Sequence, residues 1–443
     1  MTVNMDLAVL HSSSRMHYDV IVRGWRPMVS DIPVATSERR AFWMYWTSTT
    51  VSYLGDGIRF VALPLLAATL TSSPAQVASV ALAAGLPWPL FGLLAGVVAD
   101  RRDRNRLLLG SQVMRAALGF LLAFGVATGH VSLVFLVVFA FTLNIGEVFY
   151  DIALHSYLPA IVPEAMLQRA NSRLVTAETV VFEFVGPAAG GFLFARMASL
   201  PFFADAATFG LSAGILWALG RRTRPSAAPE PDPVRRNSVR SELADGLRWF
   251  WSHRLVRSLT FVAAANNLGL GGLYAILVLF VRNDIGRGAD AYGVLIALGA
   301  LGSVVGGLTV SRLTGPGPRR AIIVGTAPVT ALTMFVIAGS ANYLATALSL
   351  IVGGLVVTQV NVVAISLRQA LIPAALIGPV TAVHRVVCWG VLPLGALLSG
   401  LAGQVLGVRA AIGACGVAVL LVSVIILPGL LRIPAAAYTR EAG

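Results

Sequence analysis

Long apolar segments, separated by Gly, Pro or charged residues, dominate the pattern of this chain. A transmembrane helix needs about 20 predominantly apolar residues, and each segment reaches that length. Six segments run over residues 42–69, 76–99, 107–128, 131–155, 171–195 and 201–220. Six more run over residues 258–281, 290–311, 320–340, 343–367, 376–403 and 408–431. The pattern therefore predicts an all-α polytopic membrane protein with twelve transmembrane helices.

The composition supports a membrane location. Hydrophobic residues make up 57% of the chain and charged residues only 12%, which is too little polar surface for a water-soluble protein. The formal net charge is +13, and every basic residue counted in it is arginine, because the chain contains no lysine. These arginines lie in short loops, where retention on the cytoplasmic face explains them, so we expect no nucleic-acid partner. Two cysteines, Cys388 and Cys415, are too few for a disulfide framework and predict inert core thiols.

The arginines also predict the orientation of the chain. Its first segment of about 40 residues is polar and shows no secretory signal, so we expect the amino terminus to lie inside. The loops then assigned outside hold only Arg196, Arg282, Arg287 and Arg409. The loops assigned inside include Arg39, Arg40, Arg101, Arg102, Arg104, Arg106, Arg221, Arg222, Arg224, Arg235, Arg236, Arg240, Arg248, Arg254 and Arg257. This asymmetry predicts a multi-pass protein of the cytoplasmic membrane with both termini cytoplasmic.

Two copies of a six-helix unit are predicted. Leu54-Gly55 is echoed by Leu268-Gly269, and Pro163 by Pro373, at spacings of 210 to 214 residues. Such duplication is typical of transporters, in which one half rocks against the other around a central site. The expected divisions are a cytoplasmic segment (1–40), an N-terminal bundle (41–220), a cytoplasmic linker (221–257), a C-terminal bundle (258–431) and a cytoplasmic tail (432–443). Apolar residues at helical spacing in the linker predict an amphipathic helix, for which membrane anchorage is preferred over a regulatory partner site.

The segment joining the second and third spans, residues 96–106 (GVVADRRDRNR), resembles the signature loop of the major facilitator superfamily, G-x-x-x-D-R-x-G-R-R/K. Most members have Gly at the position of Asp103, but D-R-x-D-R is familiar in the drug-exporter branch. The resemblance implies that Asp100 pairs across helix ends and latches the outward-facing state. The alternative is a positive-inside loop that happens to contain an acid. The residues of this gating motif are Gly96, Asp100, Arg101, Arg104 and Arg106.

A second motif lies in the fifth span, where Gly186, Pro187, Gly190 and Gly191 form the string GPAAGG. It resembles the G-P-x-x-G-G antiporter motif of proton-coupled drug exporters. Small residues one turn apart let helices approach closely, and proline bends the axis, so helix packing alone is the alternative.

The wider chain, over about residues 40–431, is similar to bacterial macrolide and enterobactin exporters of the same superfamily. The shared residues are Leu54, Gly55, Asp56, Gly57, Pro159, Ala170, Asn171, Arg248 and His253. The resemblance implies a major facilitator fold of two pseudo-symmetric six-helix bundles and drug:proton antiport. We expect the protein to be a monomer.

Ionisable residues at membrane depth are functional candidates because their burial is costly. Glu147 and Asp151 are four residues apart and stack on one helix face, so repulsion and desolvation predict that the pair holds a single proton. The alternative is that one acid is tied to Arg115. The proton-coupling candidates are Glu147, Asp151, Asp56 and Glu183, with a neutralised Asp56–Arg59 pair as the alternative for Asp56. Asp205 and Glu178 lie near span ends and are expected to be interfacial caps.

Spans one, four, seven and ten line the cavity in the superfamily, and the resemblance points to polar and aromatic residues in these spans. Packing is the alternative role for each of them. The cavity candidates are Tyr53, Phe149, Tyr150, Asn266, Asn267, Tyr274, Gln359 and Asn361.

No HExxH motif and no metal-spaced cluster occurs in the sequence, so we expect neither an enzyme nor a cofactor or metal. The predicted function is proton-coupled efflux of a small amphipathic organic compound, an antibiotic or secondary metabolite, by alternating access. Its partners are the substrate, protons and the lipid bilayer. A siderophore or lipid exporter of the same fold is the alternative, and a multi-pass enzyme or a non-transporting scaffold is the alternative from another class.

Overall fold

The computed structural model describes residues 36–221, 239–310, 312–313, 316–373 and 376–431, and every regular element within these ranges is helical. The first half contains α2 (Thr36–Leu70), α3 (Pro74–Gly85), α4 (Pro87–Arg101), α5 (Arg104–Ala127), α6 (Leu133–Ile161), η1 (Glu164–Met166), α7 (Leu167–Ala177), η2 (Glu178–Val185), α8 (Gly186–Arg196) and α9 (Leu200–Gly220). The second contains α10 (Val239–Ser252), α11 (Arg254–Leu279), η3 (Phe280–Asp284), α12 (Ala289–Val310), α13 (Pro316–Gly339), α14 (Tyr343–Leu371), α15 (Ile377–Leu406) and α16 (Val408–Leu431).

Twelve spans in these described ranges are long and apolar enough to cross a membrane, which confirms the predicted number and order of transmembrane segments. Three spans depart from a single α-helix. The second is divided into α3 and α4 at Leu86, next to Pro87, which has no N–H to continue the ladder. The fifth and seventh contain the π-helices η2 and η3. The fourth was predicted to end at residue 155, but α6 continues to Ile161 and accommodates Pro159 in its last turn.

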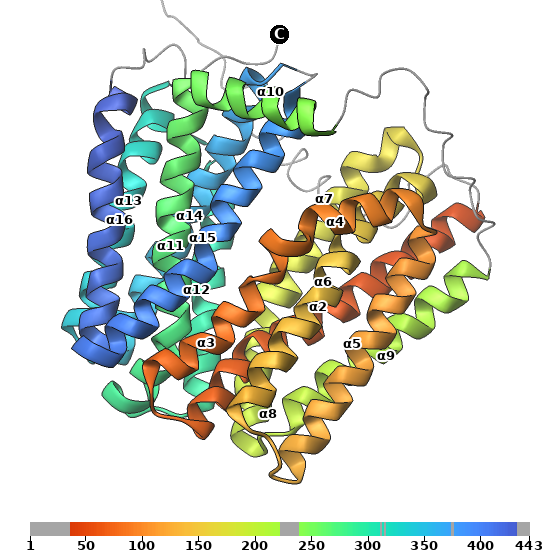
Figure 1. Cartoon of the computed structure of the whole chain (residues 1–443), viewed down its shortest axis with the longest axis horizontal. Helices are drawn as coiled ribbons and strands as arrows, with labels where there is room; N and C mark the ends of the chain where they lie inside the picture. The colour runs from red at the N-terminus through yellow and green to blue at the C-terminus, as the bar shows by residue number, and fades with distance from the viewer. Residues whose placement is uncertain (1–35, 222–238, 311, 314–315, 374–375, 432–443) are drawn as a thin grey trace, which may run out of the picture.

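The two halves form separate bundles that meet at one end. Figure 1 shows α2 to α9 in one group and α11 to α16 in the other, with α10 lying across the end of the second group. The groups converge at the end opposite α10 and diverge toward α10. Helix α10 packs against α15 and α11.

Close contacts between the halves are made by two equivalent helix pairs, α3 with α15 and α8 with α12. A Cβ atom built on Gly191 of α8 would lie 2.9 Å from the Cα atom of Gly293 in α12. In the other pair, a Cβ atom on Gly403 would lie 2.9 Å from Cβ of Pro74. Glycines therefore let the membrane helices approach closely where the bundles meet. Because α3 and α12, like α8 and α15, occupy corresponding places in the two halves, the two interfaces follow the duplicated pattern.

The hydrophobic cores follow the same arrangement. The largest core cluster joins both halves and contains Leu66 and Phe202 of the first half with Leu277 and Tyr292 of the second. A second cluster around Tyr45 belongs to the first half alone. Two further clusters belong to the second half and include Phe250 of α10. The bundles therefore share apolar packing at one end, and each has its own packing elsewhere.

Candidate functional site

Five charged side chains meet inside the first bundle, between four helices. Their ion-pair contacts are made without lysine or histidine. We call them the charge cluster: Asp56 and Arg59 of α2, Arg115 of α5, Glu147 of α6 and Asp205 of α9.

Arg59 contacts all three acids of the charge cluster. Its Nη2 atom lies 2.6 Å from Oδ1 of Asp56 and 2.8 Å from Oε2 of Glu147. Its Nε atom lies 3.5 Å from Oδ2 of Asp205. The spacing of three residues on one helix face brings Asp56 and Arg59 together, as their positions in the sequence indicate. The other two acids reach Arg59 only because α6 and α9 pack beside α2.

Arg115 is the second cation of the charge cluster, and its side chain is 0% exposed. It donates a hydrogen bond to Asp56, and its Nη2 atom lies 3.7 Å from Oε2 of Glu147. Its guanidinium carbon lies 3.9 Å from the centre of the Phe209 ring. A cation over an aromatic face is stabilised by the ring quadrupole, most strongly where water is excluded. Gln112 accepts a further hydrogen bond from Arg115 at 3.3 Å.

Asp205 lies in the interior of the bundle, so the expectation that it caps a helix at the interface is wrong. Its side chain is 1% exposed. A Cβ atom built on Gly55 would lie 2.8 Å from Oδ1 of Asp205, which shows how closely α2 and α9 approach. Distance from the end of an apolar segment therefore gave the wrong depth for this residue, because Gly55 removes the side chain that would keep α9 away.

The two acids of the predicted pair, Glu147 and Asp151, have different surroundings in the structure. Glu147 contacts Arg59 at 2.8 Å and belongs to the charge cluster. Asp151 is half-buried one turn along α6 and, among the residues that the structure describes, takes part in no ion pair. Glu178 and Glu183 are half-buried on η2, and Glu183 precedes the glycine motif by one turn. π-helical turns are frequent at functional sites. A proton-carrying role for Glu147, Asp151, Asp56 or Glu183 stays a prediction.

The gating motif lies at the junction of α4 and α5. Asp103 accepts a hydrogen bond from the backbone N–H of Arg106 at 3.1 Å and is the N-cap of α5. N-capping explains an acid where most of the superfamily has glycine. Arg104 donates to the backbone carbonyl of Ser156 in α6 at 3.0 Å. Arg101 and the Arg106 side chain are exposed, and Gly96 is half-buried. The side chain of Asp100 lies outside what the structure describes, as do residues 1–35, 222–238 and 432–443.

The glycine motif of α8 lies between α2 and α12. A Cβ atom built on Gly186 would lie 2.6 Å from Cα of Gly57 in α2, and one on Gly190 would lie 2.5 Å from the carbonyl oxygen of Ile58. Gly191 faces α12 across the boundary between the halves, and the carbonyl of Pro187 lies close to Gly293 there. The motif thus packs α8 against its own bundle and the opposite one.

The cavity candidates of the first half are largely packed inside it. Tyr53 and Tyr150 are buried in the cluster around Tyr45, and Phe149 is half-buried. Sequence reasoning missed Phe60, which is 40% exposed and whose ring lies 6.1 Å from that of Tyr274 in the opposite half. Its position next to Arg59 was the available signal.

The cavity candidates of the second half mostly bond within their own bundle. Asn266 is buried and donates to a carbonyl of its own helix. Asn267 donates to the backbone carbonyl of Cys388 at 2.8 Å, which links α11 to α15. Gln359 donates to Thr309 at 3.0 Å, and Asn361 is exposed on α14. Among the described contacts of this half, Tyr274 and Asn361 are therefore the candidates whose side chains make no hydrogen bond within the bundle.

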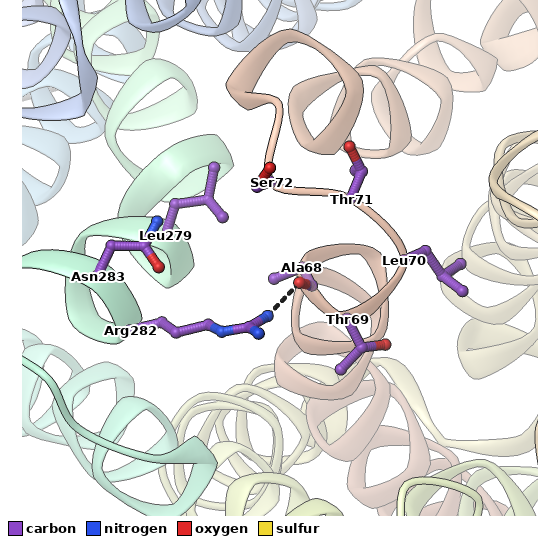
Figure 2. A pocket seen from close by; sticks show the side chains of 8 residues that line it. All are labelled: Ala68, Thr69, Leu70, Thr71, Ser72, Leu279, Arg282 and Asn283. Carbon is purple, nitrogen blue, oxygen red and sulfur yellow. Dashed lines mark hydrogen bonds between the residues drawn. The ribbon is translucent and has the colours of Figure 1, made fainter.

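The end where the bundles converge carries polar contacts between the halves. Arg282 of η3 donates to the backbone carbonyl of Ala68 near the end of α2 (Figure 2). Ser73, before α3, donates to Gln404 near the end of α15 at 2.6 Å. A small cavity of about 300 Å³ lies beside Arg282. Figure 2 shows its lining residues, Ala68, Thr69, Leu70, Thr71, Ser72, Leu279, Arg282 and Asn283.

Comparisons with known proteins agree with this architecture. Residues 32–440 match the family described as "Transmembrane secretion effector". The multidrug efflux pump Tap of Mycobacterium tuberculosis (strain ATCC 25618 / H37Rv) is 28% identical over 375 residues, 82% of this chain and 87% of that protein. Macrolide efflux protein A of Streptococcus pyogenes is 26% identical over 153 residues, which are 34% of this chain and only 38% of that relative. A bacterial homologue of the lysosomal transporter Spinster, in an inward-facing and occupied conformation, superposes with a TM-score of 0.72 at 14% identity, over 90% of this chain and 98% of that one.

Proposed function

Because the chain belongs to the transmembrane secretion effector family of major facilitator transporters, we propose that it exports a small amphipathic organic compound in exchange for protons. Transport proceeds by alternating access, in which the two bundles rock about a central site. The observation that carries this proposal is the charge cluster. Burying a group of acids and arginines in a membrane protein costs several kcal/mol of stability, so such a group supports a functional role.

The acids of the membrane interior belong to one half only. Asp56, Glu147 and Asp205 contact arginines in the first bundle, whereas the sequence has no Asp or Glu from residue 254 to 283 or from 291 to 431. Proton binding near neutral pH is a property of carboxylates whose environment disfavours their charge. We therefore assign proton coupling to the first bundle and expect the second bundle to contribute to the substrate site.

The contacts between the halves support alternating access. Close glycine packing joins them at one end only, and they diverge toward α10 (Figure 1). We assign the diverging end to the cytoplasm because the arginine-rich junction of α4 and α5 and the arginines of α10 lie there. We infer that this conformation faces inward, because the bundles are apart at the cytoplasmic end and packed together at the other.

The substrate class follows from the side chains near the charge cluster. Glu147, Asp151 and Glu183 add negative charge, and Phe60 and Tyr274 add aromatic faces. Carboxylates and aromatic rings together favour lipophilic cations. Two relatives are named as macrolide and multidrug efflux proteins, which agrees with an antibiotic or secondary metabolite as the compound exported. The same comparisons support the cytoplasmic membrane of a bacterium as the location.

Proteoliposomes loaded with the purified protein test the proposal. An imposed pH gradient should drive tetraphenylphosphonium or ethidium against its own gradient, and a protonophore should abolish this movement. Asp245→Asn is a matched control, because Asp245 is an exposed carboxylate of α10 that pairs only with Arg248 among its described ion pairs. Transport of every probe at rates insensitive to the pH gradient would contradict proton exchange. Gradient-driven movement of a siderophore or a lipid, without any of these cations, would favour the alternative exporter.

A further inference from the structure

The charges of the cluster do not balance. Three carboxylates, those of Asp56, Glu147 and Asp205, face two guanidinium groups, those of Arg59 and Arg115. With every group ionised the cluster has a formal charge of −1, because arginine stays protonated in proteins. A net charge is costly in a buried, low-dielectric site. A single bound proton makes the cluster neutral.

The contacts show which acid the arginines leave uncompensated. Asp56 accepts hydrogen bonds from both Arg59 and Arg115, and Glu147 accepts one from Arg59. Neither carboxylate oxygen of Asp205 receives a hydrogen bond from any described residue. Its one ion-pair contact is Nε of Arg59 at 3.5 Å, which also lacks a hydrogen-bond partner there. Asp205 is almost fully buried, so bulk water does not replace the missing partners.

We propose that Asp205 is the proton-binding residue of the transporter, and that Arg59 couples it to a cationic substrate bound at Glu147. This inference rests on the proposed function and names a proton site in α9. It departs from the predicted Glu147–Asp151 pair, because Glu147 already has Arg59 as its counter-ion. Asp205 has the same arginine beside it, but in contact through a different nitrogen.

The exchange works through competition for Arg59. Glu147 is the most exposed member of the charge cluster, with 24% of its side chain accessible. A substrate cation that pairs with Glu147 displaces the Arg59 Nη2 donor, and the guanidinium then turns its charge toward Asp205. The O–H bond of the Asp205 carboxyl group breaks, the proton passes to water, and the carboxylate that remains is paired with Arg59. Rebinding of a proton reverses each step and releases the cation.

Charge is conserved over this exchange. A monovalent cation brings one positive charge into the site as one proton leaves it. The exchange of one monovalent cation for one proton is therefore electroneutral. The charged groups that face Asp205 all take part in this balance: Asp56 and Arg59 from α2, Arg115 from α5 and Glu147 from α6.

Proton release on binding tests the proposal without any transport. Tetraphenylphosphonium is added to the purified full-length protein in weakly buffered detergent with a pH indicator. Wild type should release about one proton per bound cation. In the pH range where Asp205 is protonated, its Kd for the cation should fall about tenfold for each unit that the pH rises. Asp205→Asn should bind the cation with a pH-independent Kd and release no proton. Asp245→Asn should behave as wild type.

A conservative variant covers the case in which Asp205→Asn does not fold. Asp205→Glu keeps a titratable group and should restore proton release. In infrared difference spectra, the carbonyl-stretch band of the protonated acid lost on cation binding should change frequency in this variant. Proton release that persists in Asp205→Asn, or a band unmoved in Asp205→Glu, would overturn the assignment. Wild type that binds the cation without releasing a proton would overturn it as well. The proposed function fails separately, if wild-type proteoliposomes show no gradient-driven transport.

Discussion

Arg282 donates a hydrogen bond to the backbone carbonyl of Ala68, a residue 214 positions earlier in the chain. The same interval separates Leu54-Gly55 from Leu268-Gly269. Arg282 and Ala68 therefore occupy corresponding positions in the two copies, and they touch where the copies converge. A contact between corresponding positions places both residues next to the pseudo-two-fold axis that relates the bundles.

Removing this contact should favour opening of the end opposite α10. A hydrogen bond from a charged donor contributes about 1.5–3 kcal/mol, so Arg282→Gln should raise the population open at that end about tenfold or more. The measurement is labelling of a cysteine placed at Ala68, which is buried in this conformation, with a membrane-impermeant maleimide. Arg409→Gln is the matched control, because Arg409 donates to the carbonyls of Ala338 and Gly339 within one bundle. Equal labelling in the two variants would contradict the latch.

The glycine contact between α8 and α12 should be sensitive to added side-chain volume. Gly191→Val places side-chain atoms against Gly293, where overpacking costs about 1–3 kcal/mol. We expect labelling of a cysteine placed at Ala68 to rise and probe transport to fall in Gly191→Val. Gly210→Val is the control, because a Cβ atom there meets no other group within 4 Å. Wild-type transport rates in Gly191→Val would show that the contact between α8 and α12 tolerates a larger side chain.

Asp100 should act through gating. We expect Asp100→Asn to keep the expression level and Tm of wild type but to reduce proteoliposome transport about tenfold, because a charge is lost at a cytoplasmic latch. Asp103→Asn is the control three residues away, since asparagine caps a helix as well as aspartate does. If both variants transport as wild type does, the loop serves as a topology signal alone.

The predicted acid pair can be separated from Asp205 by the same assays. If the Glu147–Asp151 pair carries the proton, Asp151→Asn or Glu147→Gln uncouples gradient-driven transport while substrate exchange without a gradient survives. If Asp205 carries it, Asp151→Asn retains proton release on cation binding, and Glu147→Gln weakens cation binding itself. The comparison needs only the four single variants at Glu147, Asp151, Asp205 and Asp245.

The start of α11 should loosen in acid. Its N-cap is His253, whose Nδ1 accepts the N–H of Val256 at 3.4 Å, and burial lowers the pKa of this imidazole from its ordinary value of 6.5. A lowered folded-state pKa gives stability that is complete above about pH 6.5 and is lost as pH falls through the folded-state pKa. Protonation also converts the accepting nitrogen into a donor. Hydrogen exchange at Val256 should therefore quicken in acid relative to His253→Asn, which caps without titrating.

The fold could be predicted because apolar length and repeated residues are properties of the sequence alone. Twelve spans follow from apolar length, and the duplicated halves follow from repeats such as Leu54-Gly55 and Leu268-Gly269. The Asp56–Arg59 contact also follows, since it needs only helical spacing. The place of Asp205 did not, because its depth depends on how closely α9 approaches Gly55. Phe209 lies one turn beyond Asp205, so its contact with Arg115 was equally a matter of packing between helices.

The π-helix η2 sets the direction in which α8 faces. Its i→i+5 turns hold one more residue than α-helical turns do, so residues 178–185 act as an insertion within the fifth span. If the same residues formed an α-helix instead, all of α8 would rotate by about 100°. Gly191 would then turn away from Gly293 although neither residue had changed. The meeting of the two bundles thus depends on the turn geometry of a segment that contains neither glycine.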